Sequence, residues 1–337
     1  PPRLSLEQCS SESTAQYKST LVERVVSDKR SMADLTGGFG VDFAFLAPRL
    51  NTATYIEQWA ELTTLARHNF PLLGLSHAII LEADATKALA TLPHQSLIFI
   101  DPARRDEVGR KTVQLADCTP NLLDLLPLLE EKCDTLVCKL SPMLDLHTAL
   151  CELSPIAEAH IIAAGGECKE LLLVRQHKAS STAPTQIVSA DEKESFCFSF
   201  EEEQASTPIY IKENAELSGL FLYEPNAALM KAGPFRLLSQ RYGVHKLHPN
   251  SHLYVSPTAV PNFPGRSFRI LTECSFNKHA LKTALADIPA ANLAVRNFPQ
   301  SVATLRQKLR LKEGGAHYLF ATTLVNGDHA LLICEKA

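Results

Sequence analysis

Short apolar runs with the character of β-strands alternate with helical patterns along the chain from residue 33 to residue 176. Strands that alternate with helices in this way form a mostly parallel sheet with helices packed on its faces. A further helical pattern at 11–26, which carries Lys18, precedes the first strand. This alternation predicts an α/β domain. We expect its strands at residues 33–35, 53–57, 78–82, 97–101, 135–139, 157–163 and 171–175, with helices such as 58–70 and 121–132 between them.

The alternation stops after residue 176. The tract 178–194 is rich in Ser, Thr, Ala and charged residues, which predicts a connector or a surface hairpin. Beyond it strands and helices mix without a regular order, so we expect a smaller α+β domain. The expected boundary divides the 337 residues into domains 1–178 and 179–337. In the second domain we expect strands at 195–200, 208–211, 266–271, 317–323 and 330–334 and helices at 226–236, 278–286 and 301–309.

Composition narrows the class of protein. No apolar run approaches the ~20 residues that span a bilayer, so we expect no membrane segment. Nine cysteines without a CxxC pair or an amino-terminal signal sequence fit a reducing compartment, and we expect a cytoplasmic protein. The histidines lack the spacing of metal ligands, so we expect no metal site. The chain starts at Pro1 without Met, which leaves room for a preceding amino-terminal segment.

Positive charge is concentrated in one part of the second domain. The whole chain has a net charge of -4, yet residues 231–312 hold 13 Lys and Arg against two Asp and Glu, a local net charge of +11. Residues 1–178 and 179–230 are acidic, with local net charges of -6 and -7. A basic block attracts polyanions because neutralised phosphates release their counterions. We expect a nucleic acid partner; the alternative is a solvated basic surface without a partner.

Acidic residues and glycines follow the first four expected strands. In an open parallel sheet, ligands bind outside the carboxyl ends of the strands, where a glycine turn lets the backbone approach a ligand. An acid after the second strand can accept hydrogen bonds from the ribose of a nucleotide-like cofactor. These positions predict a cofactor site, unless the acids only cap helices in a domain without a cofactor. The candidate cofactor-binding residues are Asp34, Thr36, Gly37, Gly38, Gly40, Glu57, Asp84 and Asp101.

Two cofactors are candidates for such a site, a dinucleotide and S-adenosylmethionine. The dinucleotide fingerprint GxGxxG would need Gly at position 43 after Gly38 and Gly40, and Phe43 stands there, which disfavours NAD. The run from Asp34 to Asp42 resembles motif I of class I methyltransferases, with Thr36 where many members have Gly. The resemblance implies S-adenosylmethionine as the cofactor. It also implies a Rossmann-like sheet of seven strands, mostly parallel, with the last strand antiparallel.

The same resemblance implies roles for the residues at the ends of the second, third and fourth expected strands. Glu57 and Asp84 resemble the residues that hold the ribose and the adenine of the cofactor. The run Asp101-Pro102-Ala103-Arg104 is similar to motif IV, which borders the methyl acceptor. It departs from the Asn/Asp-Pro-Pro-Tyr/Phe form of many amino methyltransferases, so we do not expect an exocyclic amine as the acceptor.

Five further runs resemble landmarks of a bacterial family of methyltransferases with a carboxy-terminal THUMP-like domain. The resemblance spans nearly the whole chain. Because THUMP domains generally accompany RNA-modifying enzymes, it implies an RNA substrate such as rRNA or tRNA, which agrees with the basic block at 231–312. The five runs lie at residues 8–12, 140–145, 165–170, 223–227 and 295–299.

Four ionisable residues are expected at one edge of the sheet. Lys18 precedes the first strand, Asp101 and Lys139 end the fourth and fifth, and Glu170 stands at the start of the seventh. An antiparallel seventh strand would start at the edge where the parallel strands end. The order resembles the Lys-Asp-Lys-Glu tetrad of ribose 2'-O-methyltransferases, in which a lysine polarised by its neighbours activates the hydroxyl. The alternative is an ion pair of Lys139 with Glu170 and a solvated Lys18.

Arg104 and Arg105 follow motif IV and are candidates for binding a substrate phosphate, because guanidinium groups match phosphate geometry. The alternative is a salt bridge within the loop to Asp106 or Glu107. No Cys stands next to this motif, which argues against the covalent catalysis that pyrimidine carbon methylation uses.

The leading hypothesis is therefore an S-adenosylmethionine-dependent RNA methyltransferase. A small-molecule methyltransferase would use the second domain as a lid and would show no salt-dependent RNA affinity. A non-catalytic RNA-binding protein with a vestigial pocket would bind RNA equally well after Asp101→Ala. A dehydrogenase is the least favoured alternative.

Overall fold

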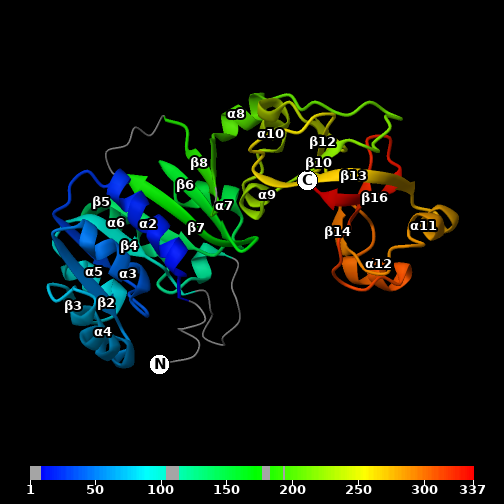
Figure 1. Ribbon diagram of the computed structural model, residues 1–337. Coiled ribbons are helices and arrows are strands. Elements are labelled where there is room, and N and C mark those ends of the chain that lie inside the picture. The colour runs from blue at the N-terminus through cyan, green and yellow to red at the C-terminus, as the bar shows by residue number, and fades with distance from the viewer. Residues whose placement is uncertain (1–8, 104–113, 177–182, 193) are drawn as a thin grey trace. The chain divides into compact units, whose positions relative to one another are not determined.

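The computed structural model describes residues 9–103, 114–176, 183–192 and 194–337, so Arg104 and Arg105 lie outside the described residues. The chain forms two compact units, Pro1–Cys197 and Phe198–Ala337 (Figure 1). The boundary comes later than the one expected after residue 178. The reason is that strands β8 (Gln186–Ala190) and β9 (Ser195–Phe198) extend the sheet of the first unit. Strand β8 lies within the tract that was expected to be a connector or a surface hairpin, and β9 corresponds to the strand expected at 195–200, which was assigned to the second domain.

The first unit contains all seven strands that the sequence predicts, within a few residues of the expected bounds. They are β1 (Ser31–Asp34), β2 (Thr52–Glu57), β3 (Ile79–Glu82), β4 (Gln95–Ile100), β5 (Cys133–Leu140), β6 (Glu158–Ala164) and β7 (Glu167–Gln176). With β8 and β9 they form a nine-stranded sheet in the order β3-β2-β1-β4-β5-β7-β6-β8-β9.

The direction of the strands decides which ends meet. Strands β1 to β5 run parallel to one another, so their carboxyl ends share one edge of the sheet. Strand β7 runs antiparallel to both β5 and β6, which confirms the expected reversal of the seventh strand. Leu140 at the end of β5 pairs with Leu171 near the start of β7. The first residues of β7 therefore lie at the edge where the parallel strands end.

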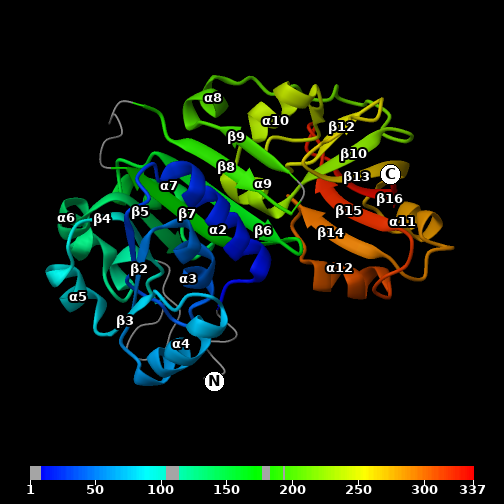
Figure 2. The same cartoon turned by 60° about the vertical axis from the view of Figure 1, so that its left-hand side comes forward.

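Three helices pack on one face of this sheet through a shared apolar core. Helix α2 (Glu12–Val25) is the predicted leading helix and begins at Ser11, whose side chain accepts the Thr14 N–H. Its buried side chains join those of α3 (Val41–Leu46) and α4 (Ala60–Leu72). Figure 2 shows α2 and α3 lying in front of the strands. The remaining helices of the unit are α5 (Ala85–Thr91), α6 (Leu122–Lys132) and α7 (Leu146–Glu152).

The second unit is an α+β fold on a seven-stranded sheet. Its strands are β10 (Phe221–Pro225), β11 (His245–Lys246), β12 (Tyr254–Ser256), β13 (Gly265–Ser275), β14 (Asn292–Arg296), β15 (Tyr318–Thr323) and β16 (His329–Lys336). Their order is β11-β12-β10-β13-β16-β15-β14, with β14 and β15 parallel and the other pairs antiparallel. Its helices are α8 (Phe200–Ala205), α9 (Ala227–Ala232), α10 (Phe235–Tyr242), α11 (Lys278–Ala284) and α12 (Val302–Leu309).

Several expectations for the second unit are wrong in detail. The expected strand at 208–211 is reduced to a single bridge between Tyr210 and Lys246. The expected helix at 226–236 breaks at Gly233, which adopts φ +82 and ends α9 before α10 begins. Strands β10, β11, β12 and β14 were not predicted. Strands β11 and β12 are two and three residues long, which is too short for a pattern. Strands β10 and β14 have five residues each, and buried and exposed positions do not alternate along them.

A buried carboxylate connects three strands of this unit. Glu224 of β10 is 2% exposed and accepts the Arg266 Nε–H of β13 at 2.8 Å. Its other oxygen lies 2.6 Å from the Arg296 guanidinium at the end of β14. Two of the sequence landmarks, 223–227 and 295–299, therefore meet in one ion-pair cluster. The cluster is structural, because both guanidinium groups are engaged with the carboxylate.

Among the residues that the structure describes, no helix is long and apolar enough to cross a membrane.

Candidate active site

The turn after β1 is held by contacts from β2. Both carboxylate oxygens of Glu57 accept backbone N–H groups, from Gly38 at 2.8 Å and from Trp59 at 2.9 Å. The Tyr55 hydroxyl donates to the Gly38 carbonyl at 2.5 Å. A Cβ atom on Gly37 would lie 2.1 Å from the Tyr55 ring. The glycine at 37 is therefore required by packing against β2 rather than by the approach of a ligand.

We expect Gly37→Ala to destabilise the first unit by about 2 kcal/mol or more, because the new methyl group overlaps a buried ring that is itself tightly packed. Thermal unfolding followed by circular dichroism measures the effect. Gly74→Ala is the matched control: Gly74 has φ +78 with no atom within 4 Å of an added Cβ, so only about 1 kcal/mol of backbone strain is expected. Equal losses in the two variants would contradict the packing argument.

Two other acids of the expected cofactor site, Asp84 and Asp34, differ in their surroundings. Asp84 is exposed and caps α5 by accepting the Lys87 N–H at 3.1 Å, so its helix-capping role is real. Asp34 is 1% exposed and accepts the Thr36 N–H at 3.0 Å. Burial raises the pKa of the Asp34 carboxyl well above its usual value, although the Thr36 N–H opposes this. Asp34 thus stabilises the glycine turn through a buried hydrogen bond to its backbone.

Thr36 connects the glycine turn with the end of β4. Its hydroxyl oxygen accepts the Asp101 N–H at 2.6 Å. A glycine at this position, which many class I methyltransferases have, would lack this acceptor. The threonine therefore fixes the backbone from which the Asp101 side chain projects.

Lys139 lies between two carboxylates at the carboxyl ends of the strands. Its Nζ is 2.6 Å from Asp101 and 3.3 Å from Asp42. Burial opposes the charge on Lys139, but Asp101 and Asp42 outweigh this effect and raise its pKa well above the usual value. For Asp42, burial would raise the pKa, but Lys139 and Lys18 lower it below the usual value. Both groups are therefore charged at neutral pH.

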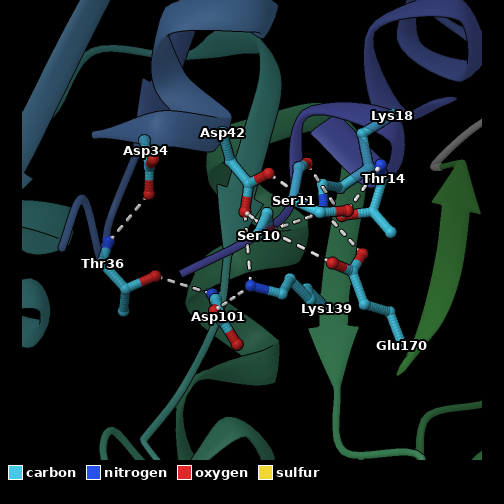
Figure 3. A network of polar contacts seen from close by, with 10 residues as sticks. All are labelled: Ser10, Ser11, Thr14, Lys18, Asp34, Thr36, Asp42, Asp101, Lys139 and Glu170. Atoms are coloured by element: carbon cyan, nitrogen blue, oxygen red, sulfur yellow. Dashed lines mark hydrogen bonds and ion pairs between the residues drawn. The ribbon is translucent and has the colours of Figure 1, made fainter. Parts of the chain in front are cut away.

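Asp42 joins this pair to a second one deeper in the protein. Lys18 of α2 lies 3.0 Å from Asp42 and 2.5 Å from Glu170 of β7. The Ser10 hydroxyl is in contact with all three groups, with Lys18 at 2.9 Å, Asp42 at 2.8 Å and Glu170 at 3.1 Å. Figure 3 shows Asp42 between the two lysines. The four residues of the expected tetrad thus belong to one network, in the order Asp101, Lys139, Asp42, Lys18 and Glu170.

Asp42 and Ser10 were missed in the sequence analysis as members of the site. Asp42 lies in the first turn of α3, directly after the glycine turn, where an acid is ordinarily explained by the helix dipole. Ser10 precedes the N-cap of α2 and carries no catalytic signal of its own. The available signal was the position of Asp42 beside the glycine turn, at the same sheet edge as Lys139.

A cavity of about 680 Å³ opens at this edge of the sheet. The glycine turn, Glu57 and Asp84 line one part of it, with Asp42, Asp101 and Lys139 also on its wall. Trp59 and Met143 line it as well and are 64% and 71% exposed. The tetrad therefore divides into an outer pair, Asp101 and Lys139, and an inner pair, Lys18 and Glu170. The inner pair does not belong to the lining and its side chains are 0% and 6% exposed.

Two family models match the second unit. Residues 221–264 match a ferredoxin-like domain, and residues 265–336 match a THUMP domain-like model. In the structure both segments contribute strands to the same sheet, joined through the pair β10–β13.

Comparisons over the whole chain identify methyltransferases. The chain is 36% identical to a "putative methyltransferase" from Porphyromonas gingivalis W83, and the solved structure of that protein aligns with a TM-score of 0.87 over 99% of this chain and 83% of that one. It is 27% identical over 288 residues to an "uncharacterized S-adenosylmethionine-dependent methyltransferase" of Mycobacterium tuberculosis, in strains CDC 1551 and H37Rv. That alignment covers 84% of this chain and 74% of the relative.

The residues that line the cavity are suited to bind S-adenosylmethionine. Its volume lies within the roughly 300–1,000 Å³ of small-molecule sites. The Glu57 oxygens each keep a second lone pair, so they can accept ribose hydroxyls while they hold the turn. Dinucleotide binding is disfavoured further because Phe43 is 0% exposed and packs against Phe70. The chain belongs to the family of class I S-adenosylmethionine-dependent methyltransferases that carry a THUMP-like domain in their carboxy-terminal part.

Proposed function

We propose that this methyltransferase modifies RNA and that its acceptor is a ribose 2'-hydroxyl. The observation that carries the proposal is the ion pair of Lys139 with Asp101 on the wall of the cavity, beside the glycine turn. When bound, S-adenosylmethionine supplies an electrophilic methyl group. A hydroxyl becomes an effective nucleophile only when a nearby group takes its proton. The carboxylate of the Lys139–Asp101 pair is a group that can take the proton of an acceptor hydroxyl.

The geometry favours Asp101 as the proton acceptor. Lys139 holds its proton between two carboxylates, and an ammonium group has no lone pair with which to accept another. The Asp101 side chain is 31% exposed, whereas that of Lys139 is 7% exposed. We infer that the hydroxyl proton passes to Asp101 as the oxygen gains the methyl group. Lys139 orients that carboxylate and, through Asp42, is held in place by the buried pair of Lys18 and Glu170.

RNA is supported as the substrate by the second unit. It matches a THUMP domain-like model over residues 265–336, and residues 231–312 hold 13 cations against two acids. A small metabolite would have no use for a charge excess of this size, whereas a phosphate backbone is attracted by it. Arg104 and Arg105 remain candidates for a further phosphate contact next to Asp101.

Nucleoside mass spectrometry tests the proposal. RNA from a strain that lacks the gene is incubated with the full chain and S-adenosylmethionine, then digested to nucleosides. We expect one additional methylated nucleoside with the methyl group on the ribose. Asp101→Asn should lower its rate of formation about 10²- to 10⁴-fold, the range for loss of a general base. Asp124→Asn is the matched control, since Asp124 lines the same cavity outside the ion-pair network.

The outcomes separate the competing functions. A methyl group on a base would rule out the ribose acceptor while leaving the RNA substrate. Cofactor binding without any RNA methylation would favour a small-molecule methyltransferase. RNA binding that is unaffected by Asp101→Asn, again without methylation, would favour a non-catalytic RNA-binding protein.

A further inference from the structure

Nine of the 13 cations of residues 231–312 fall into two groups once their partners are known. In the first group the charge is used within the protein. Arg266 and Arg296 pair with Glu224, and Arg241 lies 3.4 Å from Glu202. Lys246 is 3% exposed and donates to the Pro249 carbonyl at 3.0 Å. The charge of these side chains is already balanced by a carboxylate or buried, so they add less to the attraction for a polyanion.

The second group lies on and after the two helices α11 and α12. All of its members are exposed, and no acidic side chain in the described part of the chain forms an ion pair with them. We call this group the α11–α12 surface. It consists of Lys278, Lys282, Lys308, Arg310 and Lys312.

Packing places Lys278, Lys282 and Lys308 on neighbouring exposed sides of the two helices. Leu281 of α11 and Leu305 of α12 are buried in the same apolar core against the sheet, so the opposite sides of both helices face solvent. Lys278 and Lys282 are four residues apart and share the exposed side of α11. The Lys308 amine lies 4.9 Å from the centre of the Phe276 ring, just before α11 begins. The two helices therefore present their positive charge together.

Little negative charge balances this surface. Between residues 276 and 312 the only acid is Asp287. Arg306 of α12 has a contact of 3.9 Å with Glu313, which is 86% exposed. Like charges on one surface repel one another and are a cost to the free protein, which a bound polyanion removes. No aromatic side chain between residues 276 and 312 is exposed, so the surface suits phosphates rather than stacked bases.

We propose that the α11–α12 surface is where this protein contacts the phosphate backbone of its RNA. The inference rests on the proposed RNA substrate and adds the location and the kind of contact. Four of the five residues are lysines, which bind a phosphate as point charges. Only Arg310 has a guanidinium group, which can form two parallel hydrogen bonds to a phosphate. Such contacts position the RNA without reading its sequence, so they serve any RNA that the enzyme binds.

Fluorescence anisotropy with a labelled RNA hairpin, measured with the full chain across a salt series, tests the location. We expect Lys278→Ala/Lys282→Ala to bind about tenfold more weakly at low salt. We also expect the negative slope of log K against log salt to become shallower by about 1.4, roughly 0.7 for each lost phosphate contact on a single strand and more on a duplex. The matched control is Lys212→Ala/Lys336→Ala, which removes the same charge from exposed positions of the same unit. This control should change the affinity less than about twofold.

Hydrogen exchange provides a second measurement that does not depend on a substitution. RNA should slow amide exchange in residues 276–312 of the wild-type chain. If both double variants lose affinity and slope equally, or neither does, the α11–α12 surface is not the contact, although RNA binding itself stands. If the wild-type chain binds anionic vesicles but not the hairpin, or binds the hairpin without salt dependence, the proposed RNA substrate fails and this inference fails with it.

Discussion

Replacing Lys139 by alanine is expected to lower the rate of methyl transfer about 10²- to 10⁴-fold while S-adenosylmethionine still binds. The substitution removes the ammonium group that orients Asp101 and leaves Asp101 and Asp42 without the cation between them. Methyl transfer is measured by nucleoside mass spectrometry under single-turnover conditions, and cofactor affinity by isothermal titration calorimetry. Retained cofactor affinity would show that the loss is not a failure to fold.

Two further variants help to explain the expected loss of activity in Lys139→Ala. Lys169→Ala removes an exposed lysine from the neighbouring strand β7, and we expect its activity to be close to that of the wild type. Asp42→Asn removes one of the three carboxylates that raise the pKa of Lys139, so the lysine should lose its proton at a lower pH. The activity of this variant should therefore decline at a less alkaline pH than that of the wild type. A Lys139→Ala enzyme with normal activity would exclude the proposed role of the ion pair.

Removing the Glu224 carboxylate is expected to destabilise the second unit by about 2–4 kcal/mol. Glu224→Gln leaves Arg266 and Arg296 facing a neutral amide at a position that is 2% exposed. The loss should be smaller than for a fully buried ion pair, because the Arg266 side chain is 54% exposed and can turn toward water. Hydrogen exchange in β10, β13 and β14 follows the second unit separately from the first.

Glu273→Gln is the matched control for this substitution. Glu273 also lies on the sheet, in β13, but burial raises its pKa and no described cation pairs with it. Its replacement should change stability by less than about 0.5 kcal/mol. If Glu224→Gln is equally mild, the cluster that joins the two landmark runs of the second unit has no structural importance.

The fold of the first unit was largely predictable because its signals are local. Short apolar runs mark each of the seven strands β1 to β7, and Ser11 marks the start of the leading helix. The acids Glu57, Asp84 and Asp101 were assigned correctly to the edge of the sheet, because a parallel sheet places all its carboxyl strand ends together. Strand β8 was missed because it lies in the polar tract 178–194. Strand β9 was expected, at 195–200, but as part of the second domain rather than of this sheet.

The candidate site was predicted only in outline. The order of Lys18, Asp101, Lys139 and Glu170 along the chain was enough to place them at one edge. It was not enough to show that Asp42 connects them. Nothing in the neighbourhood of Asp42 in the sequence points to a lysine 97 residues away. The same holds for the Thr36 hydroxyl, which finds the Asp101 N–H 65 residues further along.

The sequence by itself determined the family, the succession of the seven strands β1 to β7 along the chain and the excess of positive charge in residues 231–312. The tertiary structure alone decided which charges are neutralised within the protein. Glu224 pairs with Arg266 and Arg296, whereas Lys278 and Lys308 are left exposed. The physical reason is that periodicity and turn chemistry depend on neighbours in the chain, while ion pairs and burial depend on which distant residues the fold brings within a few ångströms.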